Sequence, residues 1–229
     1  MSMPMPFAYA SPEQVMKDRA DYARRNIARG KPIVALEYDG GVLLLAENPS
    51  SMLHKVSEIY DRIAFAGVGK YDEYERLRIL GIRQADLKGY AYSREDVTAR
   101  SLANLYSQVL GEVFTTSLKP FEVEILVAGV GDDGAGTELY QVTFDGVVTD
   151  QHGVAALGGQ SEALKAFLVE RYEETPDLTA AIKLGLEALR SVSTADLGVD
   201  GLEAAVLDRG LPRRKFRRLA DAEVSSALS

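Results

Sequence analysis

Tight turns join consecutive apolar runs in this chain, and a turn this short pairs its two strands antiparallel. Asp39-Gly40-Gly41 separates the apolar runs 33–38 and 42–46, and Asp145-Gly146 separates two later runs in the same way. A parallel pair would need a crossover of a dozen or more residues. The sequence therefore predicts antiparallel sheets and argues against a doubly wound parallel fold.

Helical periodicity occurs in pairs of segments between the blocks of strands. The expected strands cover 33–38, 42–46, 55–60, 62–68, 121–128, 138–144, 147–148, 153–157, 201–207 and 215–219. The expected helices cover 12–29, 70–87, 161–173 and 175–191. A further helix is expected after the cap at 93–96, with apolar residues along one face as far as 113. Two sheets packed between two helix pairs satisfy this order. We therefore expect an α+β fold, a four-layer αββα sandwich with an extra N-terminal helix.

Composition removes several classes of protein. The chain of 229 residues contains no cysteine, which excludes disulfide scaffolds, cysteine-ligated zinc and thiol nucleophiles. The net charge is −8, and residues 12–31 and 209–218 each hold six of the 26 basic side chains. The strongly acidic remainder makes nucleic acid a poor partner. The two basic segments could instead meet an acidic surface, such as that of a neighbouring copy.

No run approaches 18 apolar residues, so we expect no membrane span. The first ten residues lack the basic and long apolar regions of a secretory signal, and we interpret 1–10 as a flexible tail. Residues 11–229 are then a single domain, because no linker divides them.

Three features are candidates for chemistry. Gly129-x-Gly131-x-x-Gly134 has the spacing of a dinucleotide fingerprint, but the residues after it read as a strand rather than the required helix. His54 and His152 are the only histidines, and no carboxylates stand at ligand spacing beside them, so we expect no metal site. Lys55, at the start of a strand, reads from its position alone as an exposed edge lysine.

Several segments resemble proteasome α-subunits, and the register holds from about residue 7 to 219. The matching stretches are 11–14, 22–25, 30, 33–36, 40–44, 55–61, 64–67 and 89–92. The actinobacterial form is the most similar, judged by Ser11-Pro-Glu-Gln14, Ala46–Ser50 and Pro212–Arg218. The resemblance implies the N-terminal-nucleophile hydrolase fold, which is the sandwich expected above.

The resemblance also implies a role without catalysis. Catalytic members of the family expose an N-terminal Thr where the first strand begins, because the free amine acts as base for the hydroxyl. Here the matching place reads Gly30-Lys31-Pro32, so no catalytic residue is expected. We expect no cofactor and a cytoplasmic location.

The implied partners are other proteasome subunits. Such α-subunits form seven-membered rings that cap rings of proteolytic β-subunits, and protein substrates pass through them. A hexameric AAA ATPase docks its C-terminal peptides in pockets between α-subunits. By this resemblance Lys55 pairs with the terminal carboxylate of the docked peptide, and Gly69 lies on the pocket wall.

The tail is the implied gate. Phe7, Ala8, Tyr9 and Ala10 would lie in it, with Pro12 at the turn into the first helix. The Tyr-Asp-Arg run of archaeal and eukaryotic tails is absent, so the contacts of the gate are not assigned.

Two rival functions remain. An autonomous amidohydrolase of the same fold would need a processed N-terminal Thr, Ser or Cys. A dinucleotide-binding enzyme would use Gly129–Gly134.

Overall fold

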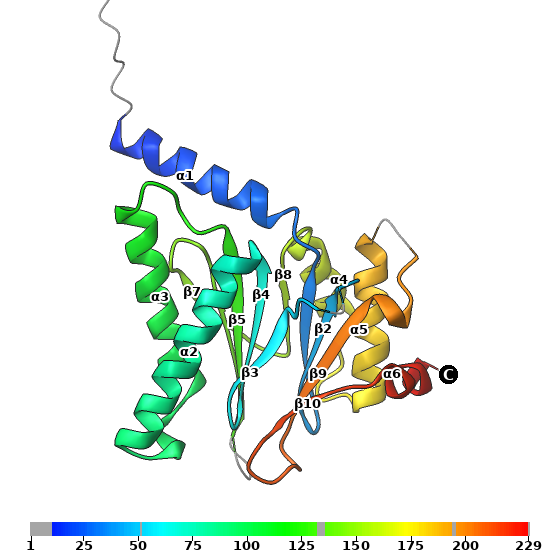
Figure 1. Ribbon diagram of the computed structural model, residues 1–229. Coiled ribbons are helices and arrows are strands. Elements are labelled where there is room, and N and C mark those ends of the chain that lie inside the picture. The colour runs from blue at the N-terminus through cyan, green and yellow to red at the C-terminus, as the bar shows by residue number, and fades with distance from the viewer. Residues whose placement is uncertain (1–10, 51, 132–135, 194–195, 229) are drawn as a thin grey trace, which may run out of the picture.

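The computed structural model describes residues 11–50, 52–131, 136–193 and 196–228, and two five-stranded antiparallel sheets form its centre (Figure 1). The first sheet has the strand order β10-β9-β2-β1-β8, and the second has the order β3-β4-β5-β6-β7. The first sheet comprises β1 (Ile33–Tyr38), β2 (Gly41–Glu47), β8 (Val154–Leu157), β9 (Leu202–Asp208) and β10 (Phe216–Arg218). The second comprises β3 (Val56–Tyr60), β4 (Ile63–Gly69), β5 (Val123–Val130), β6 (Thr137–Val142) and β7 (Val148–Gln151).

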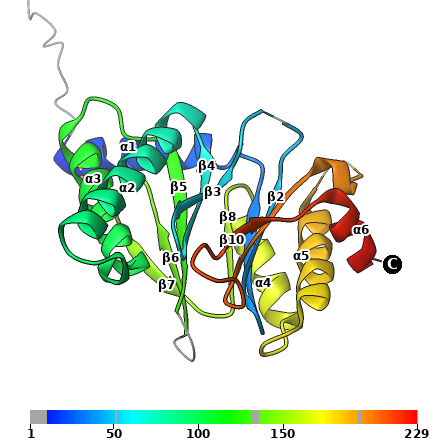
Figure 2. The ribbon, with the colours of Figure 1, turned by 60° about the horizontal axis from the view of Figure 1, so that its bottom comes forward.

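Helices cover the outer face of each sheet. The helices α2 (Tyr71–Ala91) and α3 (Ala99–Thr116) lie on the second sheet, while α4 (Ser161–Arg171) and α5 (Leu178–Val192) lie on the first (Figure 2). Helix α1 (Pro12–Ile27) crosses one end of the sandwich, as Figure 1 shows. The expected four-layer αββα sandwich with an extra N-terminal helix is confirmed.

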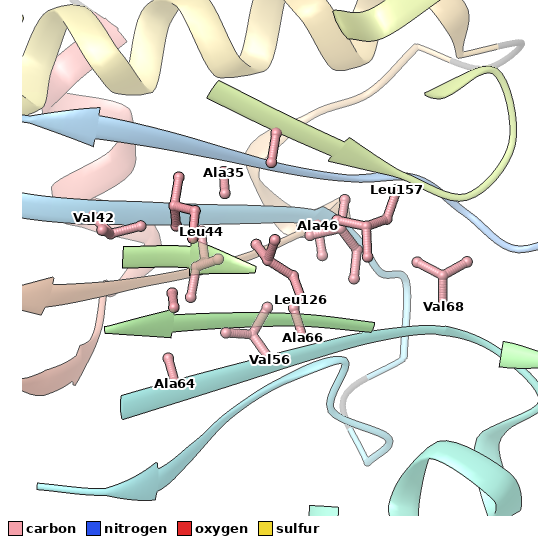
Figure 3. Close-up of a cluster of buried hydrophobic side chains, with 14 of the residues drawn as sticks. Ala35, Val42, Leu44, Ala46, Val56, Ala64, Ala66, Val68, Leu126 and Leu157 are labelled. Carbon is pink, nitrogen blue, oxygen red and sulfur yellow. The ribbon is translucent and has the colours of Figure 1, made fainter. Parts of the chain in front are cut away.

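Three apolar layers hold the sandwich together, because the strands bury both of their faces. In β1, Ile33 and Ala35 point between the sheets, and Val34 and Leu36 point at α4 and α5. Eight of the buried residues in the layer between the sheets are alanines, several of which Figure 3 labels. Alanine is therefore the commonest residue in the layer between the sheets.

Acidic side chains tie the two sheets together at the margins of this apolar layer. Each of three glutamates accepts a hydrogen bond from a residue in, or next to, a strand of the opposite sheet. The three contacts are Thr137 Oγ1 to Glu37, Gly158 N to Glu124 at 2.9 Å, and Lys55 N to Glu203 at 2.8 Å. They fix how one sheet lies on the other.

Helix α2 runs to Ala91, past the predicted end at residue 87, so Gly89 lies within the helix. Gly89 serves packing instead: a Cβ there would lie 2.2 Å from the hydroxyl oxygen of Tyr60. The expected cap at Ser93 belongs to a short 3₁₀ turn, Arg94–Asp96. Helix α3 has its own cap, since Thr98 accepts from the backbone N–H of Ser101.

The two ends of the chain also differ from expectation. Helix α1 ends at Ile27, two residues before the predicted end. A 3₁₀ turn, Val199–Gly201, precedes β9, and a further helix, α6 (Asp221–Leu228), follows β10 where the sequence predicted no element. Val224 of α6 is buried with residues of α5, so this helix extends the layer on the first sheet.

Candidate functional site

The junction between α1 and β1 packs tightly against the end of β4. A Cβ on Gly30 would lie 2.4 Å from Cγ1 of Val68 and 3.3 Å from the backbone nitrogen of Gly69. The carbonyl oxygen of Gly30 accepts from the backbone N–H of Gly159 at 3.2 Å. Glycine is therefore needed at position 30 to let the junction pack against the end of β4.

Gly69 is itself constrained to be glycine. Its φ is +111°, a backbone conformation that side chains with a Cβ rarely adopt, and a Cβ there would lie 1.9 Å from the carbonyl oxygen of Glu122. Gly69 ends β4 in register with Val123 of β5. Gly69 thus packs tightly beside Gly30 at the end of β4.

Lys55 reaches the same junction from the other side. It immediately precedes β3, where its carbonyl accepts from Gly67 N at 3.0 Å. Its side chain is half-buried, and Nζ donates to the carbonyl oxygen of Lys31 at 2.7 Å. Lys55 therefore contacts Lys31, and Gly69 lies against the preceding residue, Gly30. The structure thus brings Lys55 and Gly69 to the same junction, although they are 14 positions apart in the sequence.

Burial lowers the pKa of Lys55 to about 8, since desolvation disfavours the ammonium form. The charges of Glu47 and Glu203 act in the opposite direction, and that of Lys31 adds to the lowering. Lys55 is thus mostly charged at neutral pH and loses its proton more readily than an ordinary lysine. Chemically, the site offers a half-buried ammonium with one carbonyl partner.

A second lysine at the junction is held by a buried carboxylate. Lys31 Nζ lies 2.6 Å from Glu47 Oε1, and the Glu47 side chain is 7% exposed. Glu203 anchors the other side of the site, where its carboxylate accepts from the backbone nitrogens of Lys55 and Val56. Sequence analysis missed Glu47 and Glu203. The available signal was an acidic residue in each of two strands that are otherwise mostly apolar.

Of the residues assigned to the gate, the structure describes only Pro12. Phe7, Ala8, Tyr9 and Ala10 are outside the described residues. Pro12 is the first residue of α1, whose cap is Ser11, with Oγ accepting from Gln14 N at 3.2 Å. Pro12 is therefore separated from Lys55 by the length of the helix.

The remaining candidates of the sequence analysis are placed elsewhere. The residues from Thr137 onward form strand β6, as expected, so no helix follows the glycines at 129 and 131; Gly134 lies outside the described residues. His54 Nδ1 lies 3.2 Å from Glu203, and His152 is exposed. In the described part of the chain, no group of three or more His, Asp or Glu side chains could hold a metal ion.

Several side chains of the basic segment 209–218 form ion pairs within the chain. Arg214 contacts Glu58, Arg217 contacts Glu223, and Arg218 contacts Glu203. Lys215 is buried, with Nζ donating to the carbonyl oxygens of Arg209 and Leu211. The segment therefore secures β10 to its surroundings. Among the described helices, none is long and apolar enough to cross a membrane.

Two sheets between helix layers, with the first strand starting at a glycine junction, define a fold of the N-terminal-nucleophile hydrolase type. The profile of the family described as "Proteasome subunit" matches residues 27–207, and the chain belongs to this family.

Curated relatives from actinobacteria are similar over nearly the whole chain. "Proteasome subunit alpha" of Streptosporangium roseum is 54% identical over 99% of this chain and 88% of its own length. The protein of the same description from Xylanimonas cellulosilytica is 54% identical over 97% of this chain and 95% of its own. That from Thermomonospora curvata is 52% identical over 99% of both. The resemblance expected from the sequence is confirmed.

Proposed function

We propose that this chain is a non-catalytic α-ring subunit of a 20S proteasome core in protein degradation. In this role it forms, with six copies of itself, a ring on the proteolytic β-subunits. The ring is the gated entry for protein substrates and the docking surface for a hexameric AAA ATPase. The cytoplasm is the proposed location. The names and coverage of the relatives support the subunit type.

The start of β1 supports the absence of catalysis. An N-terminal nucleophile needs a free amine and a hydroxyl or thiol at that place. Here Lys31 and Pro32 precede β1, and α1 continues the chain ahead of them, with Ala23 and Ile27 packed in the layer between the sheets. The Lys31 ammonium is engaged by Glu47. An autonomous amidohydrolase would require this packed helix to be removed.

The contact between Lys55 Nζ and the Lys31 carbonyl carries the docking proposal. A terminal carboxylate is a charged acceptor and forms a stronger hydrogen bond with an ammonium than a neutral carbonyl does. A docked C-terminal peptide would therefore draw Lys55 away from the α1–β1 junction. Docking would then favour a different position of that junction, which is a population shift driven by differential binding.

Helix α1 is suited to transmit such a shift. Only Ala23 and Ile27 of the helix are buried, both in its second half. Arg19 also holds the helix, donating to the carbonyl oxygens of Val113 and Ser117. The first turn, beginning with Pro12, is exposed. A change at the junction could therefore move Pro12 and the tail 1–10 ahead of it without disrupting a buried first turn.

Co-expression with the β-subunit from the same source tests the proposal. We expect a particle of stacked rings that hydrolyses a fluorogenic peptide, and faster hydrolysis when residues 2–8 of this chain are deleted. A monomer or dimer that forms no complex with the β-subunit would refute the assignment to an α-ring.

A further inference from the structure

Glu203 accepts hydrogen bonds from several sides of the Lys55 site. It lies in β9 and is 8% exposed. Burial acts to raise the pKa of this carboxyl, but hydrogen bonds from the Lys55 N–H, Arg218 and Asn48 outweigh it and hold the pKa below its usual value. The donors are Lys55 N at 2.8 Å, Val56 N at 3.3 Å, Asn48 Nδ2 at 2.8 Å and Arg218 Nη1 at 2.6 Å, and His54 Nδ1 lies 3.2 Å from the same carboxylate.

These contacts occupy the free edge of a strand. β3 is the edge strand of the second sheet, so its outer backbone groups have no neighbouring strand. Glu203 accepts the N–H groups of Lys55 and Val56, and Arg218 Nη2 donates to the Val56 carbonyl oxygen at 2.7 Å. Two side chains of the first sheet therefore replace the missing strand at the point where Lys55 stands.

The same carboxylate also closes the loop that leads to Lys55. Asn48, directly after β2, donates through Nδ2 both to Glu203 and to the carbonyl oxygen of Leu53, the latter at 2.7 Å. Both ends of the loop from Asn48 to Lys55 thus meet on Glu203. The backbone of Lys55 is fixed by this carboxylate, and its ammonium by the Lys31 carbonyl.

We propose that Glu203 is the positioning residue of the docking site: its carboxylate fixes the backbone of Lys55 beside the α1–β1 junction, from where the ammonium can turn to a docked terminal carboxylate. This inference rests on the proposed docking of a terminal carboxylate at Lys55. Glu203 itself does not touch the docked peptide. It acts through the loop from Asn48 to Lys55 and through the edge of β3.

The variant Glu203→Gln tests whether the carboxylate positions Lys55, because it removes the charge and keeps the packing of the side chain. The amide keeps the size of the side chain but turns an NH2 group toward backbone N–H donors, and it leaves Arg218 without its charged partner. Glu58→Gln is the matched control, because Glu58 lies in β3 and pairs with Arg214 away from Lys55. Both variants are made in the full chain, co-expressed with the β-subunit.

The first measurement is the affinity of the assembled core for a synthetic peptide carrying the C-terminal sequence of the ATPase, by fluorescence anisotropy. We expect Glu203→Gln to weaken binding at least tenfold and Glu58→Gln to change it less than twofold. The double variant Lys55→Ala/Glu203→Gln should bind no more weakly than Lys55→Ala, because residues acting as one unit are not additive. Unchanged binding in Glu203→Gln, or losses that add, would overturn the inference.

The second measurement follows Lys55 without any peptide. The pH dependence of its acylation by a trace of N-hydroxysuccinimide ester, read by mass spectrometry, should show a midpoint at about 8 in the unsubstituted chain. The charged groups that face the amine are Glu47, Glu203 and Lys31. If Glu203 positions the lysine, Glu203→Gln lets the amine reach solvent, and the midpoint rises to roughly 9 or above.

A midpoint that stays or falls would refute positioning, because removing only the charge of Glu203 lowers the pKa of a lysine. This result is independent of docking. If Lys55→Ala bound the peptide normally, the docking proposal would fail, while the acylation profile would still show whether Glu203 positions Lys55.

Discussion

Gly81 of α2 lies directly against the phenol oxygen of Tyr106 in α3, so closely that a Cβ on Gly81 would come within 1.8 Å of that oxygen. The Tyr106 hydroxyl is buried and, within the described residues, has no hydrogen-bond partner. Burial raises its pKa, so it stays neutral. The two helices on the second sheet can therefore approach only because position 81 has no side chain.

Gly81→Ala is expected to destabilise the chain by about 1–3 kcal/mol, because the methyl group overpacks a site with no free space. Gly111→Ala in α3 is the control: its Cβ would meet only the Asp145 carbonyl oxygen at 3.6 Å. Alanine is the better helix former, so Gly111→Ala should be neutral or stabilising by up to about 1 kcal/mol. Urea unfolding measures the free energy of unfolding of both variants. Equal changes in Gly81→Ala and Gly111→Ala would contradict the prediction.

Deleting residues 2–8 should raise hydrolysis of a fluorogenic peptide several-fold in the assembled core, since the tail is the proposed barrier. The deletion leaves Ser11, which caps α1, in place. A core whose β-subunit nucleophile is blocked provides the background rate. The gate assignment is wrong if the deletion leaves the rate unchanged.

Lys55→Ala should abolish ATPase-stimulated degradation while peptide hydrolysis by the core alone continues. The reason is loss of the ammonium that would bind the terminal carboxylate. The measurement is the rate of degradation of a folded substrate with the ATPase, divided by the rate without it. Stimulation that survives the substitution would remove Lys55 from the docking site.

Docking should also weaken as pH rises. Only the ammonium binds a carboxylate, and burial lowers the pKa of Lys55 to about 8 in the free subunit. The charged fraction therefore falls between pH 7 and pH 9, although a bound carboxylate moves the midpoint upward. Peptide affinity over this range tests the effect. Lys55→Arg stays charged, so its affinity should show no such decline, whatever its absolute value.

Acid should reduce the contribution of Glu203 to stability. Its pKa in the folded chain is below the usual value, so its stabilising effect is complete above the unfolded pKa of about 4.3 and is lost as pH falls through the folded value. The difference in unfolding free energy between the unsubstituted chain and Glu203→Gln should shrink from pH 5 toward pH 2. A constant difference would show that the carboxylate charge is not what stabilises the site.

Local turn chemistry and apolar periodicity were sufficient to predict the layers of the sandwich. These signals failed where the role of a residue depends on a contact with a residue distant in the sequence. Gly89 reads as a helix stop, yet it faces Tyr60 from the last turns of α2. Helix α6 carries a weak apolar pattern and packs through Val224 on α5. Such contacts join segments far apart in the chain, so no short window contains them.

The candidate site shows the same limit more strongly. The resemblance supplied Lys55 and Gly69 as the proposed docking residues, but not the contacts that hold them. Glu203 lies 148 positions from Lys55 in the sequence and meets it only because β9 and β3 lie near one another in adjacent sheets. An acidic residue in an apolar strand is a visible signal of a buried partner, but the identity of that partner follows from the tertiary fold alone.

The alanine-rich layer between the sheets has a consequence for how this chain can vary. The alanines there have almost nothing left to lose, whereas enlarging Ala35, Ala66 or Ala128 would push the sheets apart. The outer layers contain larger residues such as Leu36 and Phe65, which neighbouring helices can accommodate by shifting. A saturation scan should therefore find intolerance to added volume in the middle of the molecule and intolerance to lost volume beneath the helices.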